Sequence, residues 1–141
     1  MAEYAIAPEA LKDNVARVLG DLAEDIVLAR DEVTVTVDAQ HYLQAMHTLR
    51  DDAACAFDTL IDLCGVDYST YKNRAWAGKR FAAVVHLLSV RLNQRLRVRV
   101  FCPDDDLPIL PSIIDIWAGT NWFEREAFDL YGIVFEGHPD L

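Results

Sequence analysis

The chain has 141 residues, a length that suits a single domain spanning 1–141. Apolar residues make up 52% of it, but no apolar run approaches the roughly 18 residues that a membrane-spanning helix needs. The formal net charge of −10 disfavours nucleic acid as a partner, because phosphate binding requires a basic surface.

The first elements in chain order are a helix and a β-hairpin. Apolar residues recur with helical spacing over residues 8–19, and Gly20 suits the position that ends a helix. An apolar run at 26–29 is followed by valines that alternate with threonines over 33–37. Because the segment between these two runs is short and polar, the pattern predicts two strands joined by a tight turn.

A second helix is predicted after the hairpin. Asp38 is a residue type that caps helix N-termini, and Asp51–Asp52 mark the expected end. Four residues between these limits form the predicted apolar face of the helix: Tyr42, Ala45, Met46 and Leu49.

Two apolar runs in the middle of the chain predict strands. Residues 57–66 form an imperfect strand pattern, and residues 81–90 form a nearly continuous apolar run. A continuous run is typical of a strand that is buried on both faces at the centre of a sheet. The polar, turn-rich residues 67–79 predict a loop that carries Tyr71 and Trp76.

The clearest strand of the chain alternates arginines with aliphatic residues. The arginines are Arg95, Arg97 and Arg99, and the two-residue period of a strand places them on one face. Such a row either binds phosphates or carboxylates of a ligand or forms the solvated face of the strand. Because acids are abundant in both flanking regions, internal pairing or a protein partner is favoured over nucleic acid.

The C-terminal part predicts short helices. Acids and prolines exclude regular structure over residues 103–111. Ser112 with Asp115 resembles a capping box that opens a short helix through Trp117, and Asn121 with Glu124 resembles another. The second helix is expected to end at Gly132, and four of its residues share one face: Phe123, Ala127, Leu130 and Tyr131.

The predicted order is α-β-β-α-β-β-β followed by short C-terminal helices. This order predicts an α+β fold with a largely antiparallel sheet and helices mainly on one face. The three cysteines, Cys55, Cys64 and Cys102, lack the spacing of a disulfide framework, a zinc site or an iron–sulfur site, so we expect buried thiols. The first residues lack the features of a signal or transit peptide, and we expect a cytosolic location.

Charged and aromatic residues are concentrated near the C-terminus. Glu126, Asp129 and His138 are residue types that bind metals or transfer protons, but the second carboxylate pair or the histidine spacing of known motifs is missing. A structural role is the alternative, since acids favour a first helical turn and Arg125 can pair with Asp129. The aromatic residues are denser than so small an end can bury alone, which indicates a partner surface.

The C-terminal segment resembles the signature of a known family. Asn121-Trp122-Phe123-Glu124-Arg125-Glu126 is followed by Asp129, Gly132-Ile133, Phe135 and Gly137-His138-Pro139. With this spacing the segment resembles the C-type subunit of NADH:quinone oxidoreductase, which is the 30 kDa subunit of respiratory complex I. The resemblance extends upstream through residues 62–68, 81–101 and 111–117. Family members continue beyond the position of Leu141, so we expect a C-terminal tail to be missing here.

The resemblance implies a peripheral subunit of the hydrophilic arm, on the cytoplasmic side of the bacterial inner membrane. It implies that this chain binds no cofactor, and that FMN and the iron–sulfur clusters belong to other subunits. The implied partners are chiefly the quinone-site subunit of the 49 kDa type and neighbouring iron–sulfur subunits. The implied function is to assemble and brace the quinone-reducing module without chemistry of its own.

This resemblance also implies a docking surface. Its five expected residues are Glu124, Arg125, Glu126, Asp129 and His138. Intrachain salt bridges that hold the C-terminal turn are the alternative for the same residues. Two other functions stay open, namely the corresponding subunit of a related membrane-bound hydrogenase and a self-contained enzyme that uses Glu126, Asp129 and His138 for metal or acid–base chemistry.

Overall fold

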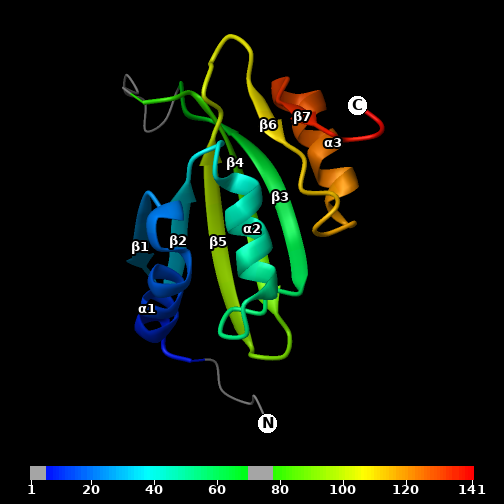
Figure 1. The fold of residues 1–141 in the computed structure, drawn as a ribbon. Helices are drawn as coiled ribbons and strands as arrows, with labels where there is room; N and C mark the ends of the chain where they lie inside the picture. The colour runs from blue at the N-terminus through cyan, green and yellow to red at the C-terminus, as the bar shows by residue number, and fades with distance from the viewer. Residues whose placement is uncertain (1–5, 70–77) are drawn as a thin grey trace.

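The computed structural model describes residues 6–69 and 78–141 (Figure 1). The helices are α1 (Pro8–Leu19), the short 3-10 helix η1 (Gly20–Leu22), α2 (Tyr42–Asp51) and α3 (Thr120–Tyr131). The strands are β1 (Asp25–Ala29), β2 (Glu32–Val37), β3 (Thr59–Asp67), β4 (Phe81–Ser89), β5 (Gln94–Phe101), β6 (Ile109–Pro111) and β7 (Val134–Glu136). Tyr71 and Trp76 of the predicted loop lie outside the described residues.

Five strands form one sheet in the order β1-β2-β5-β4-β3 (Figure 1). All neighbours in it are antiparallel except β2 and β5, and the short strands β6 and β7 pair in parallel separately. The predicted α+β fold with a largely antiparallel sheet is confirmed. The predicted burial on both faces is confirmed for β4, although β5 occupies the middle of the sheet and β4 lies one place toward the edge. β4 is still buried along most of its length, since β5 and β3 flank it.

One face of the sheet carries the core. Val35 of β2, Val98 of β5 and Val85 of β4 are fully buried neighbours across the sheet. α1 and α2 pack against this face, and α1 has the predicted bounds (Figure 1). The predicted apolar face of α2 is confirmed by its four buried residues: Tyr42, Ala45, Met46 and Leu49.

The start of α2 differs from the prediction. Asp38 does not cap this helix, which begins only at Tyr42. The Asp38 carboxylate instead accepts a hydrogen bond from the backbone N–H of His41 at 2.8 Å and contacts the His41 ring at Nδ1. Hydrogen bonding to the His41 side chain lowers the pKa of Asp38. Asp38 therefore stabilises a turn before the helix, which is a common use of this residue type.

Two predictions for residues 103–117 are wrong. β6 forms inside the proline-rich segment because it is short and pairs with β7, where Leu110 lies opposite Phe135. Residues 112–117 form turns rather than a helix. The Ser112 hydroxyl donates a hydrogen bond to Glu124, and its oxygen accepts one from the backbone N–H of Ile114 at 3.2 Å, so the cap-like contact forms without a helix after it.

The cysteines follow the prediction only in part. Cys55 and Cys102 are buried, and burial raises the pKa of Cys55 to about 11 and that of Cys102 to about 12. Cys64 is exposed, contrary to the prediction, because it follows the buried Leu63 on β3 and so points to the opposite face of the sheet. The helices in the two described ranges lack the length and hydropathy that a bilayer crossing requires.

Candidate partner-binding site

α3 lies beside β3, at the edge of the five-stranded sheet (Figure 1). The helix ends at Gly132, as predicted, with a φ of 73° that glycine adopts without strain. Gly65 of β3 permits the close approach of the last turn, because a Cβ atom there would lie 2.6 Å from Cδ2 of Tyr131. The backbone of β3 thus forms part of the surface against which α3 packs.

The inner face of α3 differs from the predicted one. Its buried residues are Thr120, Glu124 and Ala127, and Phe123 is partly buried. Leu130 is 67% exposed, so its predicted place on the inner face is wrong, whereas Tyr131, 36% exposed, lies on that face with its ring against Gly65 of β3. The reason is the inward position of Glu124, since Leu130 lies roughly 120° away from it around the helix axis.

Glu124 is fully buried and hydrogen bonded. Its Oε1 accepts a hydrogen bond from Ser112 Oγ at 2.5 Å, and its Oε2 accepts one from the backbone N–H of Ile113 at 3.0 Å. Burial raises the pKa of Glu124, while these hydrogen bonds and the nearby His138 act in the opposite direction. The expectation that Glu124 is presented on a docking surface is corrected, because its carboxylate joins the segment after β6 to α3.

His138 connects the turn after β7 to the start of α3. Its Nε2 lies 3.0 Å from the carbonyl oxygen of Asn121, and its Nδ1 accepts a hydrogen bond from the backbone N–H of Asp140 at 3.0 Å. Because a carbonyl oxygen only accepts, the neutral ring that satisfies both bonds carries its proton on Nε2. The half-buried ring therefore holds the C-terminal turn, which is the intrachain role that the sequence left open.

Five residues form an exposed surface on the outer side of α3. Arg125, Glu126 and Asp129 are exposed, and Trp122 and Leu130 beside them are 66% and 67% exposed. We call this set the α3 surface. In the part of the chain that the structure describes, no ion pair joins Arg125 to Asp129, so the predicted bridge is not formed. Large apolar side chains among exposed charges are typical of a surface that binds another protein.

Trp122 and Leu130 are not among the five residues expected at the docking surface, although Trp122 belongs to the C-terminal aromatic residues that indicate a partner surface. Trp122, Glu126 and Leu130 are spaced four residues apart, and this spacing places them on one helical face. This spacing is the feature of the sequence that could have identified the outer face of α3. Glu124 makes that face hard to recognise, because a glutamate is rarely the residue that faces the core.

The α3 surface offers contacts rather than a constellation for metal chemistry. Across residues 6–69 and 78–141, no group of three or more His, Cys, Asp and Glu side chains is placed to hold a metal ion. Both ring nitrogens of His138 contact backbone groups, so neither is paired with Glu126 or Asp129.

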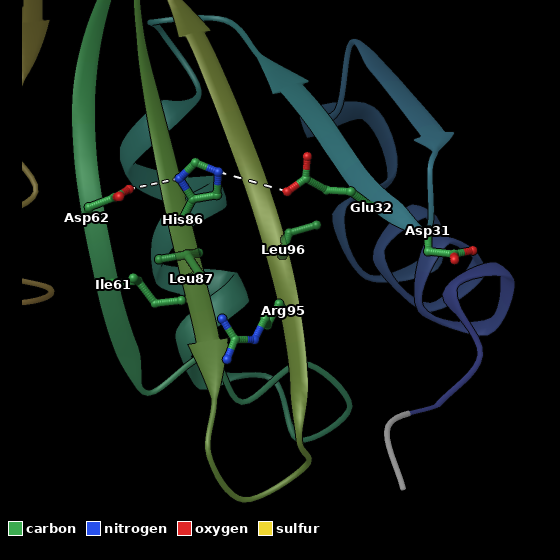
Figure 2. Close-up of a pocket in the computed structure, with 8 residues that line it drawn as sticks. All are labelled: Asp31, Glu32, Ile61, Asp62, His86, Leu87, Arg95 and Leu96. Atoms are coloured by element: carbon green, nitrogen blue, oxygen red, sulfur yellow. Dashed lines mark hydrogen bonds and ion pairs between the residues drawn. The ribbon is translucent and has the colours of Figure 1, made fainter.

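The sheet face opposite α1 and α2 carries a second set of charges. The predicted alternation on β5 is confirmed, since its aliphatic residues are buried and its arginines lie on the other face. On the same face His86 Nδ1 lies 2.8 Å from Oδ1 of Asp62, and His86 Nε2 lies 3.9 Å from Oε2 of Glu32. Figure 2 shows His86 between the two acids, which come from β3 and β2. The sequence does not predict this bridge, because it depends on the order of the strands.

Comparisons with known proteins agree with the fold and the C-terminal signature. Residues 35–141 match the family described as the respiratory-chain NADH dehydrogenase 30 kDa subunit. The chain is 59% identical over its full length to the C-type subunit of NADH-quinone oxidoreductase of Albidiferax ferrireducens, of which it covers 70%. It is 62% identical over 133 residues to the protein of the same name from Burkholderia thailandensis, covering 94% of this chain and 66% of that one.

A solved structure described as Nqo5 of a trypsin-resistant fragment is also similar. The two structures superpose with a TM-score of 0.78 at 33% sequence identity, over 93% of this chain and 98% of the other. The family match includes α3, the turn after β7 and all of β3 to β5. The chain therefore belongs to the family of the 30 kDa subunit of respiratory-chain NADH dehydrogenase.

Proposed function

We propose that the chain is a non-redox accessory subunit of the peripheral arm of proton-translocating NADH:quinone oxidoreductase. In this proposal it assembles and braces the quinone-reducing module and binds no flavin or iron–sulfur cluster. Its partners are chiefly the quinone-site subunit of the 49 kDa type and neighbouring iron–sulfur subunits, on the cytoplasmic side of the inner membrane. Family membership and relatives named as the C-type subunit of NADH-quinone oxidoreductase support a place in such a complex.

The α3 surface is the observation that carries this function. Trp122 and Leu130 expose about two thirds of their surface to solvent, at 66% and 67%. Burying side chains of this size in an interface contributes about 2 kcal/mol each. Arg125, Glu126 and Asp129 add charges that set the orientation of a partner more than its affinity. We therefore place the principal contact with the partner on this helix.

The way α3 is held favours the same role. Glu124 fixes its inner side to Ser112 and Ile113, and His138 fixes its first turn to the segment after β7. A surface that is rigid before binding loses little conformational entropy when a partner covers it. The buried residues of the signature thus support the exposed ones.

Co-purification with the quinone-site subunit tests the proposal. We expect the pair Trp122→Ser and Leu130→Ser to reduce the recovered quinone-site subunit roughly tenfold, because large apolar residues dominate most interfaces. Charge reversal by Arg125→Glu is expected to slow assembly and to make it more sensitive to salt.

The matched control is Val90→Ser, since Val90 is 65% exposed in the turn between β4 and β5. The control is expected to co-purify like the wild type, and the thermal unfolding of all variants is expected to stay close to that of the wild type. Unchanged assembly and unchanged quinone reductase activity in the α3 variants would show that the docking role is wrong.

A further inference from the structure

The arginines of β5 lack carboxylate partners. Within the described residues, no ion pair involves Arg95, Arg97 or Arg99, although the chain contains 23 acids. Arg97 Nη1 lies 3.5 Å from Thr34 Oγ1, and Arg99 Nη2 lies 3.2 Å from Thr36 Oγ1. These are contacts to neutral hydroxyls, so the charge of both guanidinium groups is left available for a ligand.

Two of these arginines, Arg97 and Arg99, line a groove on the open face of the sheet. The groove has a volume of about 650 Å³, and its lining residues include Val27, Ala29, Thr34, Thr36, Arg97 and Arg99. Arg97 and Arg99 are half-buried, and the Arg99 guanidinium also lies 5.1 Å from the ring centre of Phe101. Packing of this kind restricts both side chains, so they lose little freedom when a ligand binds.

We propose that this groove binds an extended acidic segment of a partner protein, with carboxylates at alternate positions. Side chains two residues apart on a strand are about 6.8 Å apart, and this repeat is shared by any extended peptide that lies along β5. Two such positions on β5, Arg97 and Arg99, line the groove, and Arg95 continues the row beyond it. Val27, 45% exposed on β1, lines the far side of the groove across Thr34 from Arg97 and provides an apolar contact for the segment.

The arrangement of the arginine side chains favours a peptide over a phosphate group as the ligand. A phosphate group binds where several donors converge on one point, whereas these guanidinium groups are spread along a strand. Glu32 also lines the groove and repels any anion near it, so the carboxylates of the segment are expected over Arg97 and Arg99. This surface lies on elements other than α3, so the inference goes beyond the proposed docking of the helix.

Binding of synthetic peptides to the full 141-residue chain tests the inference. The first peptide alternates Glu with Thr or Val, and the second has the same composition with its Glu residues adjacent. Fluorescence anisotropy at low ionic strength measures both affinities. We expect the alternating peptide to bind roughly tenfold more tightly, because each of its carboxylates meets one arginine.

Variants of the chain complete the experiment. Arg97→Gln with Arg99→Gln is expected to weaken the alternating peptide roughly tenfold. Val27→Glu, a change at an exposed site that leaves the arginines in place, is expected to weaken it as well. The matched control is Arg17→Gln with Arg91→Gln, which removes two exposed arginines elsewhere and is expected to bind as the wild type does.

Three results would overturn the inference. They are equal binding of the two peptides, unchanged binding by the Arg97→Gln and Arg99→Gln variant, and displacement of the alternating peptide by equimolar inorganic phosphate or by vesicles of phosphatidylglycerol. None of them bears on the co-purification test, because the α3 surface is intact in every variant used here.

Discussion

The carboxylate of Glu124 determines how α3 is oriented. It is enclosed on all sides and meets the Ser112 hydroxyl and the Ile113 amide from a segment that precedes the helix. A buried carboxylate is tolerated when hydrogen bonds satisfy its oxygens. The consequence for function is indirect, since an inward Glu124 turns Trp122 and Leu130 toward solvent.

A pH dependence of stability follows from Glu124. Burial raises its pKa above the ordinary value of 4.5, so the folded state holds the proton more tightly than the unfolded state does. Stability that depends on this group is therefore present at low pH and is lost as pH rises above 4.5. In Glu124→Gln this contribution is absent, because the amide does not titrate.

Chemical denaturation of both proteins across this pH range measures the effect. The free energy of unfolding of the wild type minus that of Glu124→Gln is expected to fall with rising pH until Glu124 is ionised. Taking the difference removes the contribution of the other acids, which the two proteins share. A difference that is independent of pH, or that grows with pH, would contradict the raised pKa.

For Glu124 and His138, the sequence indicated that the residues are important but not what their side chains contact. Glu124 and His138 were both expected at a docking surface, and both instead make hydrogen bonds within the chain. Their partners, Ser112 and Asn121, are distant in sequence and become neighbours only when β6 pairs with β7. Local patterns contain no information about such pairing, whereas the exposure of Arg125 follows from helical spacing alone.

At the scale of elements, the hairpin of β1 and β2 contains a strained turn. Arg30 and Asp31 have φ values of 52° and 63°, the left-handed conformation that a two-residue hairpin turn of type I′ requires. Neither residue type favours this conformation as Asn and Gly do. The sequence predicted the turn from its polarity, and β1 and β2 form around it as expected.

Replacing this turn by Asn-Gly should stabilise the fold. Arg30→Asn with Asp31→Gly is expected to raise the free energy of unfolding by about 1 kcal/mol, because the new residues adopt positive φ with less strain. The control is Asn93→Gly, at a turn position with a φ of 52° where the residue already suits the conformation. Urea denaturation of the three proteins measures the effect. A double variant no more stable than the wild type would contradict the assignment of strain.

Some elements were predicted correctly from the sequence and others were not, and the difference has a physical reason. α1 and the faces of β5 were predicted correctly because a long periodic pattern determines them locally. β6 was not, because a strand of three residues is stable only through its partner β7. The helix expected at 112–117 does not form, although the Ser112 oxygen accepts the hydrogen bond from the N–H of Ile114 that is typical of a cap.

At the scale of the molecule, strand order brings the charged residues together. The sequence predicts which face of β5 its arginines occupy. It does not predict that β2 lies beside β5, and this neighbour supplies Thr34 and Thr36 to the groove. Alternation fixes which side of a strand faces the core, but it leaves the order of strands open.

Solvent access to α3 in the assembled complex tests the central claim most directly. Leu130→Cys, in a Cys64→Ser background that removes the exposed native thiol, is labelled with a maleimide in the isolated chain and in the complex. We expect fast labelling of the isolated chain, labelling slowed at least roughly tenfold after assembly, and fast labelling again once the complex is dissociated. Equal labelling rates in the isolated chain and in the intact complex would contradict the claim that a partner covers the α3 surface.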